Sequence, residues 1–488
     1  MPKKQFLKDT KKKSKHTPQI PATADEYLAA GVDFEEAGEK WRGGDAVKST
    51  RFFVRAIDNY EEALKKFPNS FDLAYNRARV LYELTQYPKL RAQLPGTLLN
   101  LLSAALEASR FALSLKQDNA DILFNTAQVL TSIAEVTSET RSVGNDNNLA
   151  LLEEAIELFQ RCLALQEYQY TESQTQAGSA PTSDDDPDME EGGVPLSDPN
   201  SQPPQDDRWA SIVEPVTLET LLDTVVAQLQ TLAILCGLVN VDAGRGLAWI
   251  EEYSTTLIGQ KLQTYLEGTV DRQQEADLAR SNFIAALADA NFRFQRIDIA
   301  TYERALNDAY ASLSLDDHPE GLCDEAEAFI SYNSSLRLNH EAAQLPEASA
   351  SRWKVLTAAL DNLTKASKLP SAENLPKIHI LRGDVDLLRF QLGQPPSNYE
   401  VSFKNGAVLT KNAEKFYRGA GNFAKVEGLK KELEEAEVKE ALAMSLYGEQ
   451  DKLLRRVKLQ PEVVRNVLED AIDDGLISYE ALSAMGIA

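Results

Sequence analysis

Small and aromatic side chains recur at helical spacing through most of the chain. In the run AIDNYEEALKKFP, Ala56, Tyr60 and Ala63 stand at positions 0, +4 and +7, and Pro68 follows at +12. Residues at these intervals lie on one face of an α-helix, and a proline prevents the helix from continuing. The small residues let a second helix approach closely, while the aromatic ring packs into the gap between them. The spacing therefore predicts helical hairpins.

The same periodicity predicts helices over almost the whole chain and no sheet, because no segment alternates in polarity between hairpin turns. In the first part, Gly43-Gly44, Pro68 and Pro88 separate the helices, which are expected near 23–41, 45–66, 71–85, 97–116 and from 120 onward. Further helices are expected near 216–238, 245–267, 272–295, 298–314, 320–337, 350–369, 375–392, 405–420 and 422–447. Two short helices, broken at Gly475, are expected at the end.

Two stretches of the chain repeat internally. Phe71, Asp72, Leu73, Ala74, Tyr75, Asn76 and Ala78 match, at an offset of 49, the residues Ala120, Asp121, Ile122, Leu123, Phe124, Asn125 and Ala127. The stripe around Tyr60 returns at an offset of 99, around Phe159. Similarity at about one and two times the same period indicates a repeat array, in which each hairpin buries the apolar face of the next. An ordinary helical bundle, which also favours alanine stripes, is the alternative.

Composition divides the chain into five predicted parts. A basic tail at 1–22 and an acidic insert at 169–212, rich in Ser, Gly and Pro, are expected to be disordered. Clear repeats occupy 23–168, degenerate helical repeats occupy 213–447, and a helical cap occupies 448–488. The predicted fold class is all-α, an α-solenoid interrupted by an acidic insert.

The formal net charge is −24, from 51 basic and 75 acidic residues. Such a charge repels nucleic acid and anionic membranes and favours a basic protein as the partner, although many acidic proteins use charge only for solubility. No stretch of 18 uncharged apolar residues predicts a membrane span, and the N-terminus lacks the apolar core of a signal peptide. Three separated cysteines argue against a disulfide framework.

The two charged segments suggest separate roles. Seven lysines fall within the first fifteen positions, and a nuclear-import signal is expected at Lys11, Lys12, Lys13 and Lys15. A weak contact with RNA and a solubilising tail are the alternatives. Within the insert, the acids expected to shield a basic client are Asp184, Asp185, Asp186, Asp188, Glu190 and Glu191. This acidic run lacks the glycine and closing glutamate of a calcium loop, and a plain spacer is the alternative.

No constellation of catalytic or metal-binding residues is found. The four histidines have no His, Cys or Glu at ligand spacing, and no phosphate-binding glycine loop or GxSxG is present. No catalytic site, metal or cofactor is expected, and an enzyme with an unrecognised site is the least favoured alternative.

Residues 46–68 resemble the second helix of a tetratricopeptide (TPR) repeat, with the family pattern on Ala56, Tyr60, Ala63 and Pro68. Small residues match the eighth place of the family's first helix at Gly31, Ala78 and Ala127. The resemblance implies an inner groove lined by first helices. It implies that an extended peptide would be held there by Asn76 and Asn125, with Tyr75 and Phe124 beside them.

Solvent-facing polar roles for the two asparagines are the alternative. TPR proteins that clamp the C-terminal carboxylates of heat-shock proteins need Lys and Arg at the positions of Asp121 and Asn125. The resemblance therefore does not extend to these co-chaperones.

An acidic loop within the array also resembles the layout of tetratricopeptide histone chaperones and of dedicated chaperones of ribosomal proteins. The expected function is an adaptor or dedicated chaperone of a basic client, in nucleus and cytoplasm. No direct nucleic-acid binding is expected beyond the tail. A passive structural subunit of a larger complex is the alternative.

Overall fold

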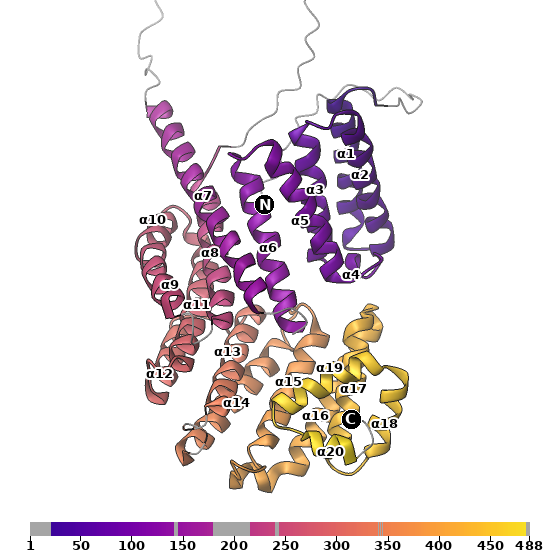
Figure 1. Cartoon of the computed structure of the whole chain (residues 1–488), viewed down its shortest axis with the longest axis vertical. Helices are drawn as coiled ribbons and strands as arrows, with labels where there is room; N and C mark the ends of the chain where they lie inside the picture. Colours follow the sequence, from indigo (N-terminus) through magenta and orange to yellow (C-terminus); the bar gives the residue numbers. More distant parts are fainter. Residues whose placement is uncertain are drawn as a thin grey trace, which may run out of the picture.

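The computed structural model describes residues 21–140, 145–178, 215–239, 244–339 and 345–484, together with residues 341 and 343. Across these residues the regular elements are all helices (Figure 1), so the all-α prediction is confirmed. The helices of the first part are α1 (Ala24–Arg42), α2 (Ala46–Lys66), α3 (Phe71–Gln86), α4 (Pro88–Arg91), α5 (Leu98–Leu115), α6 (Ala120–Thr140) and α7 (Asn145–Gly178).

The second part begins with α8 (Leu218–Leu238), followed by α9 (Gly244–Thr256), a π-helical turn (Leu257–Leu262), α10 (Gln263–Leu266) and a 3₁₀ turn (Val270–Arg272). It continues through α11 (Gln273–Arg293), α12 (Ile299–Tyr310), α13 (Pro319–Leu338), α14 (Pro346–Ala366), α15 (Leu375–Gln391) and α16 (Glu400–Glu427). The chain ends in four shorter helices, α17 (Lys430–Ser445), α18 (Gln450–Leu459), α19 (Pro461–Asp473) and α20 (Tyr479–Ala484).

The first hairpin, α1–α2, is held together by the predicted stripe. Ala56, Tyr60 and Ala63 are fully buried. Tyr60 lies directly over Gly31 of α1, where a Cβ atom would stand 2.2 Å from the ring carbon Cε1. Only glycine allows this approach, so the small residue of one helix and the ring of the other interlock as the spacing predicted.

The same interlock recurs more than 350 residues later, in α15–α16. Ala413, Tyr417 and Ala420 are buried, and a Cβ atom on Gly383 of α15 would stand 2.4 Å from the ring of Tyr417. The hairpin α15–α16 is therefore a structural equivalent of the first hairpin.

The residues matched at an offset of 49 also occupy equivalent places. Leu73 and Ala78 of α3 are buried, as are Ile122 and Ala127 of α6. Hairpins pack against their neighbours in chain order, and α7 packs against α8 across the insert. One apolar cluster joins Leu152 and Ile156 to Leu221 and Leu222, so the two halves share a core and form one array.

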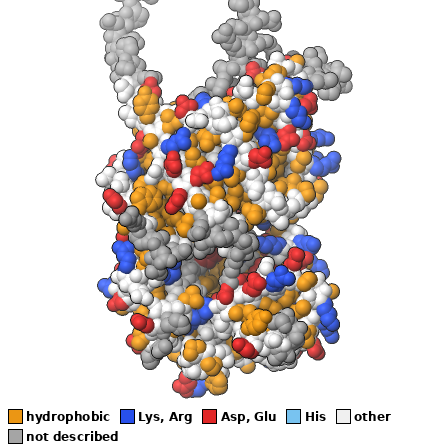
Figure 2. Space-filling model, in the orientation of Figure 1, with side chains coloured by type: hydrophobic (Ala, Val, Ile, Leu, Met, Phe, Trp, Pro, Cys, Tyr) orange, Lys and Arg blue, Asp and Glu red, His pale blue; other side chains and the backbone are white. Residues whose placement is uncertain are grey.

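The ends of the array approach each other. In Figure 1 the part that carries α1–α7 faces the part that carries α13–α20, and Figure 2 shows an indentation between them at the right edge. Lys89 of α4 and Glu427 of α16 form an ion pair across this approach, with Nζ and Oε2 3.6 Å apart.

Several boundaries differ from the predictions, and three differences are the largest. Residues 169–178 were assigned to the insert but continue α7 to Gly178, and residues 450–459 form the unpredicted α18. The predicted break between 420 and 422 is wrong, because α16 runs unbroken to Glu427 and ends at Gly428, which has φ +74°. Gly421 lies inside α16, where a Cβ atom would meet Leu433 and Ala436 of α17 at ordinary contact distances of 3.6 and 3.9 Å.

Two of the described helices are long and apolar enough to cross a membrane by length and composition, namely α5 and α8. Both contain charged residues, such as Glu107 and Asp223, and 67% of the α8 segment is buried by its neighbours. Core helices of soluble proteins pass the same test, so the absence of a membrane partner stays a prediction.

Candidate functional site

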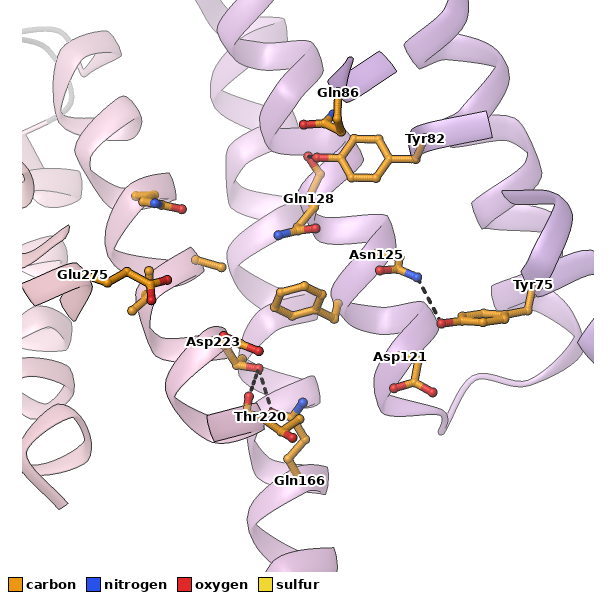
Figure 3. Close-up of a pocket in the computed structure, with 15 residues that line it drawn as sticks. Tyr75, Tyr82, Gln86, Asp121, Asn125, Gln128, Gln166, Thr220, Asp223 and Glu275 are labelled. Carbon is orange, nitrogen blue, oxygen red and sulfur yellow. Dashed lines mark hydrogen bonds between the residues drawn. The ribbon is translucent and has the colours of Figure 1, made fainter. Parts of the chain in front are cut away.

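The hollow that contains the predicted binding residues lies where α3, α6 and α8 meet (Figure 3). These are first helices of successive hairpins, and the hollow has a volume of about 300 Å³. Helix α3 contributes Tyr75, Tyr82 and Gln86, and α6 contributes Asp121, Phe124, Asn125 and Gln128. The remaining lining residues are Gln166 of α7, Thr220, Asp223, Thr224, Val226, Ala227 and Gln230 of α8, and Glu275 of α11.

The hollow is acidic. Asp121, Asp223 and Glu275 line it from three different helices, and no lysine or arginine is among the described residues of the lining. Arg272 is not a lining residue of the hollow. It forms ion pairs with both Asp223 and Glu275, which holds these two carboxylates in place. A partly enclosed site of this kind favours a cationic group, because low-dielectric walls strengthen the attraction.

Amide groups stand beside the acids. The side chain of Asn125 is 5% exposed, and its Nδ2 lies 3.4 Å from the hydroxyl of Tyr75, toward which it points in Figure 3. Gln128 follows one turn later on the same face, and its buried Oε1 atom has no hydrogen-bond partner among the described residues. A buried acceptor without a partner is costly, so a ligand that donates a hydrogen bond would be stabilised here.

Tyr75 is held in its neutral form. Burial raises the pKa of its hydroxyl well above the ordinary value, and the nearby Asp121 carboxylate raises this pKa further. The hydroxyl therefore stays protonated and can donate to an acceptor of a bound chain.

The structure separates the two asparagines that the repeat made equivalent. Asn125, Tyr75 and Phe124 line the hollow, whereas Asn76 does not. Nδ2 of Asn76 donates to the carbonyl of Asp72 at 2.8 Å, and its Oδ1 accepts from Arg79 at 3.3 Å. The amide of Asn76 thus belongs to a buried polar network inside the array.

That network joins the first two hairpins. Arg79 of α3 pairs with the buried Glu35 of α1, and Glu35 also accepts a hydrogen bond from the Tyr60 hydroxyl at 2.6 Å. Burial disfavours the charged form of Arg79, but Glu35 and Glu83 outweigh this and raise its pKa.

A second acidic hollow of about 280 Å³ lies further along, between α8, α11, α12 and α13. Asp289, Asp324 and Glu327 line it, again with no basic residue among the described lining. Burial raises the pKa of Asp324 to about 6, although a hydrogen bond from Asn282 partly offsets the effect. Acidic residues therefore line both hollows along the array.

Sequence reasoning missed Gln128, Asp223 and Glu275. Gln128 could have been found, because it lies three positions after Asn125 on one helix face. The other predicted residues lie outside the described parts of the chain. These are Lys11, Lys12, Lys13 and Lys15 of the tail and Asp184, Asp185, Asp186, Asp188, Glu190 and Glu191 of the insert.

No protein-family model matches the chain. Among curated proteins, UPF0656 protein C926.02 of Schizosaccharomyces pombe is 25% identical over 426 residues, which cover 85% of this chain and 87% of that protein. The uncharacterized protein YNL193W of Saccharomyces cerevisiae is 26% identical over 212 residues, which cover 38% of this chain and 37% of the other.

Among solved structures, the nuclear import adaptor Nro1 aligns over 82% of this chain and 90% of its own, with 12% identity and a TM-score of 0.28. A circular tandem repeat protein aligns over 93% of this chain and 99% of its own, with 16% identity and a TM-score of 0.26. Both similarities are too distant to bear on a partner.

Proposed function

We propose that this chain binds an extended, basic segment of another protein along its inner wall, and acts as an adaptor or dedicated chaperone for that client. A ribosomal protein or a histone has the required charge. The proposal rests chiefly on the hollow between α3, α6 and α8, whose described lining has Asn125, Tyr75 and three carboxylates but no basic residue, although Arg272 pairs with two of these carboxylates from outside the lining. An extended chain presents backbone donors and acceptors at regular intervals, which suits the amides of Asn125 and Gln128.

The acidic insert would act with the wall. Asp184, Asp185, Asp186, Asp188, Glu190 and Glu191 follow the end of α7, which is one of the helices lining the hollow. A cluster of carboxylates tethered near a bound basic segment raises the local negative potential and protects the client from other polyanions. A client of this kind would be escorted between cytoplasm and nucleus, with the lysines of the tail as the import signal.

Replacing Asp121 with lysine is expected to lower recovery of basic proteins by about tenfold, because a close charge pair becomes a repulsion. Tagged wild-type and variant chains would be captured from cells at low and at high salt, and co-purifying proteins would be quantified by mass spectrometry. Asp118→Lys is the matched control, since Asp118 is exposed just before α6 and outside the lining. Equal recovery by wild type and Asp121→Lys, or enrichment that ignores salt, would reject the wall as the binding site.

Deleting residues 179–212 would distinguish the proposed chaperone function from the alternative of a passive structural subunit. The deletion leaves α7 and α8 intact. A chaperone that uses its insert should lose protection of its client against aggregation, while a passive subunit should keep all its partners unchanged.

A further inference from the structure

The outer face of α16 differs from the rest of the molecular surface. Five of the thirteen large hydrophobic side chains that are exposed among the described residues belong to this one helix: Val401, Phe403, Val408, Phe423 and Val426. The inner face of α16 is used fully, because Ala413, Tyr417 and Ala420 are buried against its neighbours. Phe423 packs part of its ring against His379 of α15, but Val408 and Val426 are more than half exposed and exceed what the packing of the array needs.

Most of these side chains fall on a single line together with lysines. Successive steps of three, four or seven residues connect exposed positions along one helix face, which we call the outer stripe: Val401, Lys404, Val408, Lys411, Lys415, Asn422 and Val426. At a rise of about 1.5 Å per residue the stripe is roughly 38 Å long. Three valines and three lysines lie along it together with Asn422.

Two of the three lysines of the outer stripe form no ion pair among the described residues. Among the described residues, no ion pair involves Lys411 or Lys415, while Lys404 pairs with Glu400. The other acids of the helix point elsewhere, since Glu414 pairs with Arg418 and Glu427 pairs with Lys89. Two adjacent lysines of the stripe, Lys411 and Lys415, thus have no ion pair among the described residues, which is unusual in a chain whose net charge is −24.

We infer that the outer stripe of α16 is a docking surface for an acidic amphipathic helix of a partner protein. Carboxylates two turns and then one turn apart would face Lys404, Lys411 and Lys415, and aliphatic side chains of the partner would cover Val408 between the lysines and Val426 beyond them. A nucleic acid could not cover the valines and would be repelled by the rest of the chain. A second copy of the same stripe would bring lysine against lysine. The outer stripe lies on the face of α16 opposite to the residues that pack against α15. It is therefore separate from the hollow between α3, α6 and α8, and we assign it to a partner other than the client.

The test uses the full chain and a fluorescein-labelled helical peptide of about 25 residues that carries Leu and Glu at helical spacing on one face. Fluorescence anisotropy would measure its affinity at about 50 and 150 mM salt, conditions that differ in screening length. Lys411→Glu/Lys415→Glu is expected to weaken binding by tenfold or more. The matched control Lys452→Glu/Lys458→Glu, on exposed lysines of α18, is expected to leave the affinity within about twofold.

A charge-swapped peptide, with lysine in place of each glutamate, should recover binding to Lys411→Glu/Lys415→Glu, which also shows that this variant is folded. Val408→Ser, which removes apolar contact without adding a charge, should weaken the original peptide with little change in its salt dependence. Equal binding of a scrambled peptide of the same composition, equal losses in the control variant, or tighter binding of a single-stranded RNA of similar length would each overturn the inference. Client capture by the inner wall is independent of these outcomes.

Discussion

Glu35→Ala is expected to lower the free energy of unfolding by about 3–5 kcal/mol. Glu35 and Arg79 are both more than nine-tenths buried, and they pair across the boundary between the first and second hairpins. Removing the carboxylate leaves the Arg79 guanidinium buried, with Glu83 as its remaining acidic partner, and removes the acceptor of the Tyr60 hydroxyl. The cost is mainly that of a buried charge whose compensation is lost.

Thermal and urea unfolding of the full chain, followed by circular dichroism, would measure this loss. Lys404→Ala is the control, because its ion pair with Glu400 is exposed and is worth at most about 1 kcal/mol. Glu35→Met/Arg79→Met should be more stable than Glu35→Ala, since it leaves no buried charge. A loss below about 1 kcal/mol for Glu35→Ala would show that solvent reaches Arg79 and that the network does not join the hairpins.

Gly31→Val is expected to destabilise the first hairpin by about 3 kcal/mol, at the upper end of the usual cost of overpacking. The added side chain would collide with the ring of Tyr60, which cannot turn away because it is fully buried between helices. Gly383→Val should have the same effect on α15–α16, because Tyr417 closes over that glycine in the same way.

Hydrogen exchange with mass spectrometry would localise each loss to its own hairpin, since repeats contact mainly their neighbours. Gly237→Ala in α8 is the control, because a Cβ atom there meets nothing within 4 Å. The double variant Gly31→Val/Tyr60→Ala should cost less than the sum of its single changes, which is the signature of direct contact. Additive costs would contradict the interlock.

The local parts of the fold could be predicted from the sequence because their causes are local. The spacing of Ala56, Tyr60 and Ala63 defines a helix face, and Pro68 defines its end, without any knowledge of distant residues. The prediction placed a helix break at Gly421, but α16 continues through it, because a single glycine inside a helix costs only about 1 kcal/mol and does not by itself end the helix.

The candidate site was only partly predictable because it is assembled across the chain. Asn76 and Asn125 occupy equivalent places in the repeat, but Arg79 stands where the second copy has Gln128, and together with Glu35 of α1 it draws Asn76 into a buried network. Asp223 and Glu275 reach the hollow from helices that lie beyond the insert. Asp223 lies 98 residues after Asn125, which is twice the offset of 49, but the insert separates the two in the sequence and the stacking of hairpins brings them to one hollow.

The contact between Lys89 and Glu427 has a mechanical consequence. In an array of hairpins that mostly contact their neighbours, a small change in the angle between adjacent hairpins is added at each step along the array. The summed movement is greatest where the two ends face one another, and the exposed ion pair there offers little resistance. The distance between spectroscopic labels on α4 and on the end of α16 would therefore change when the curvature changes anywhere in the array. Two labels within one hairpin would not detect such a change.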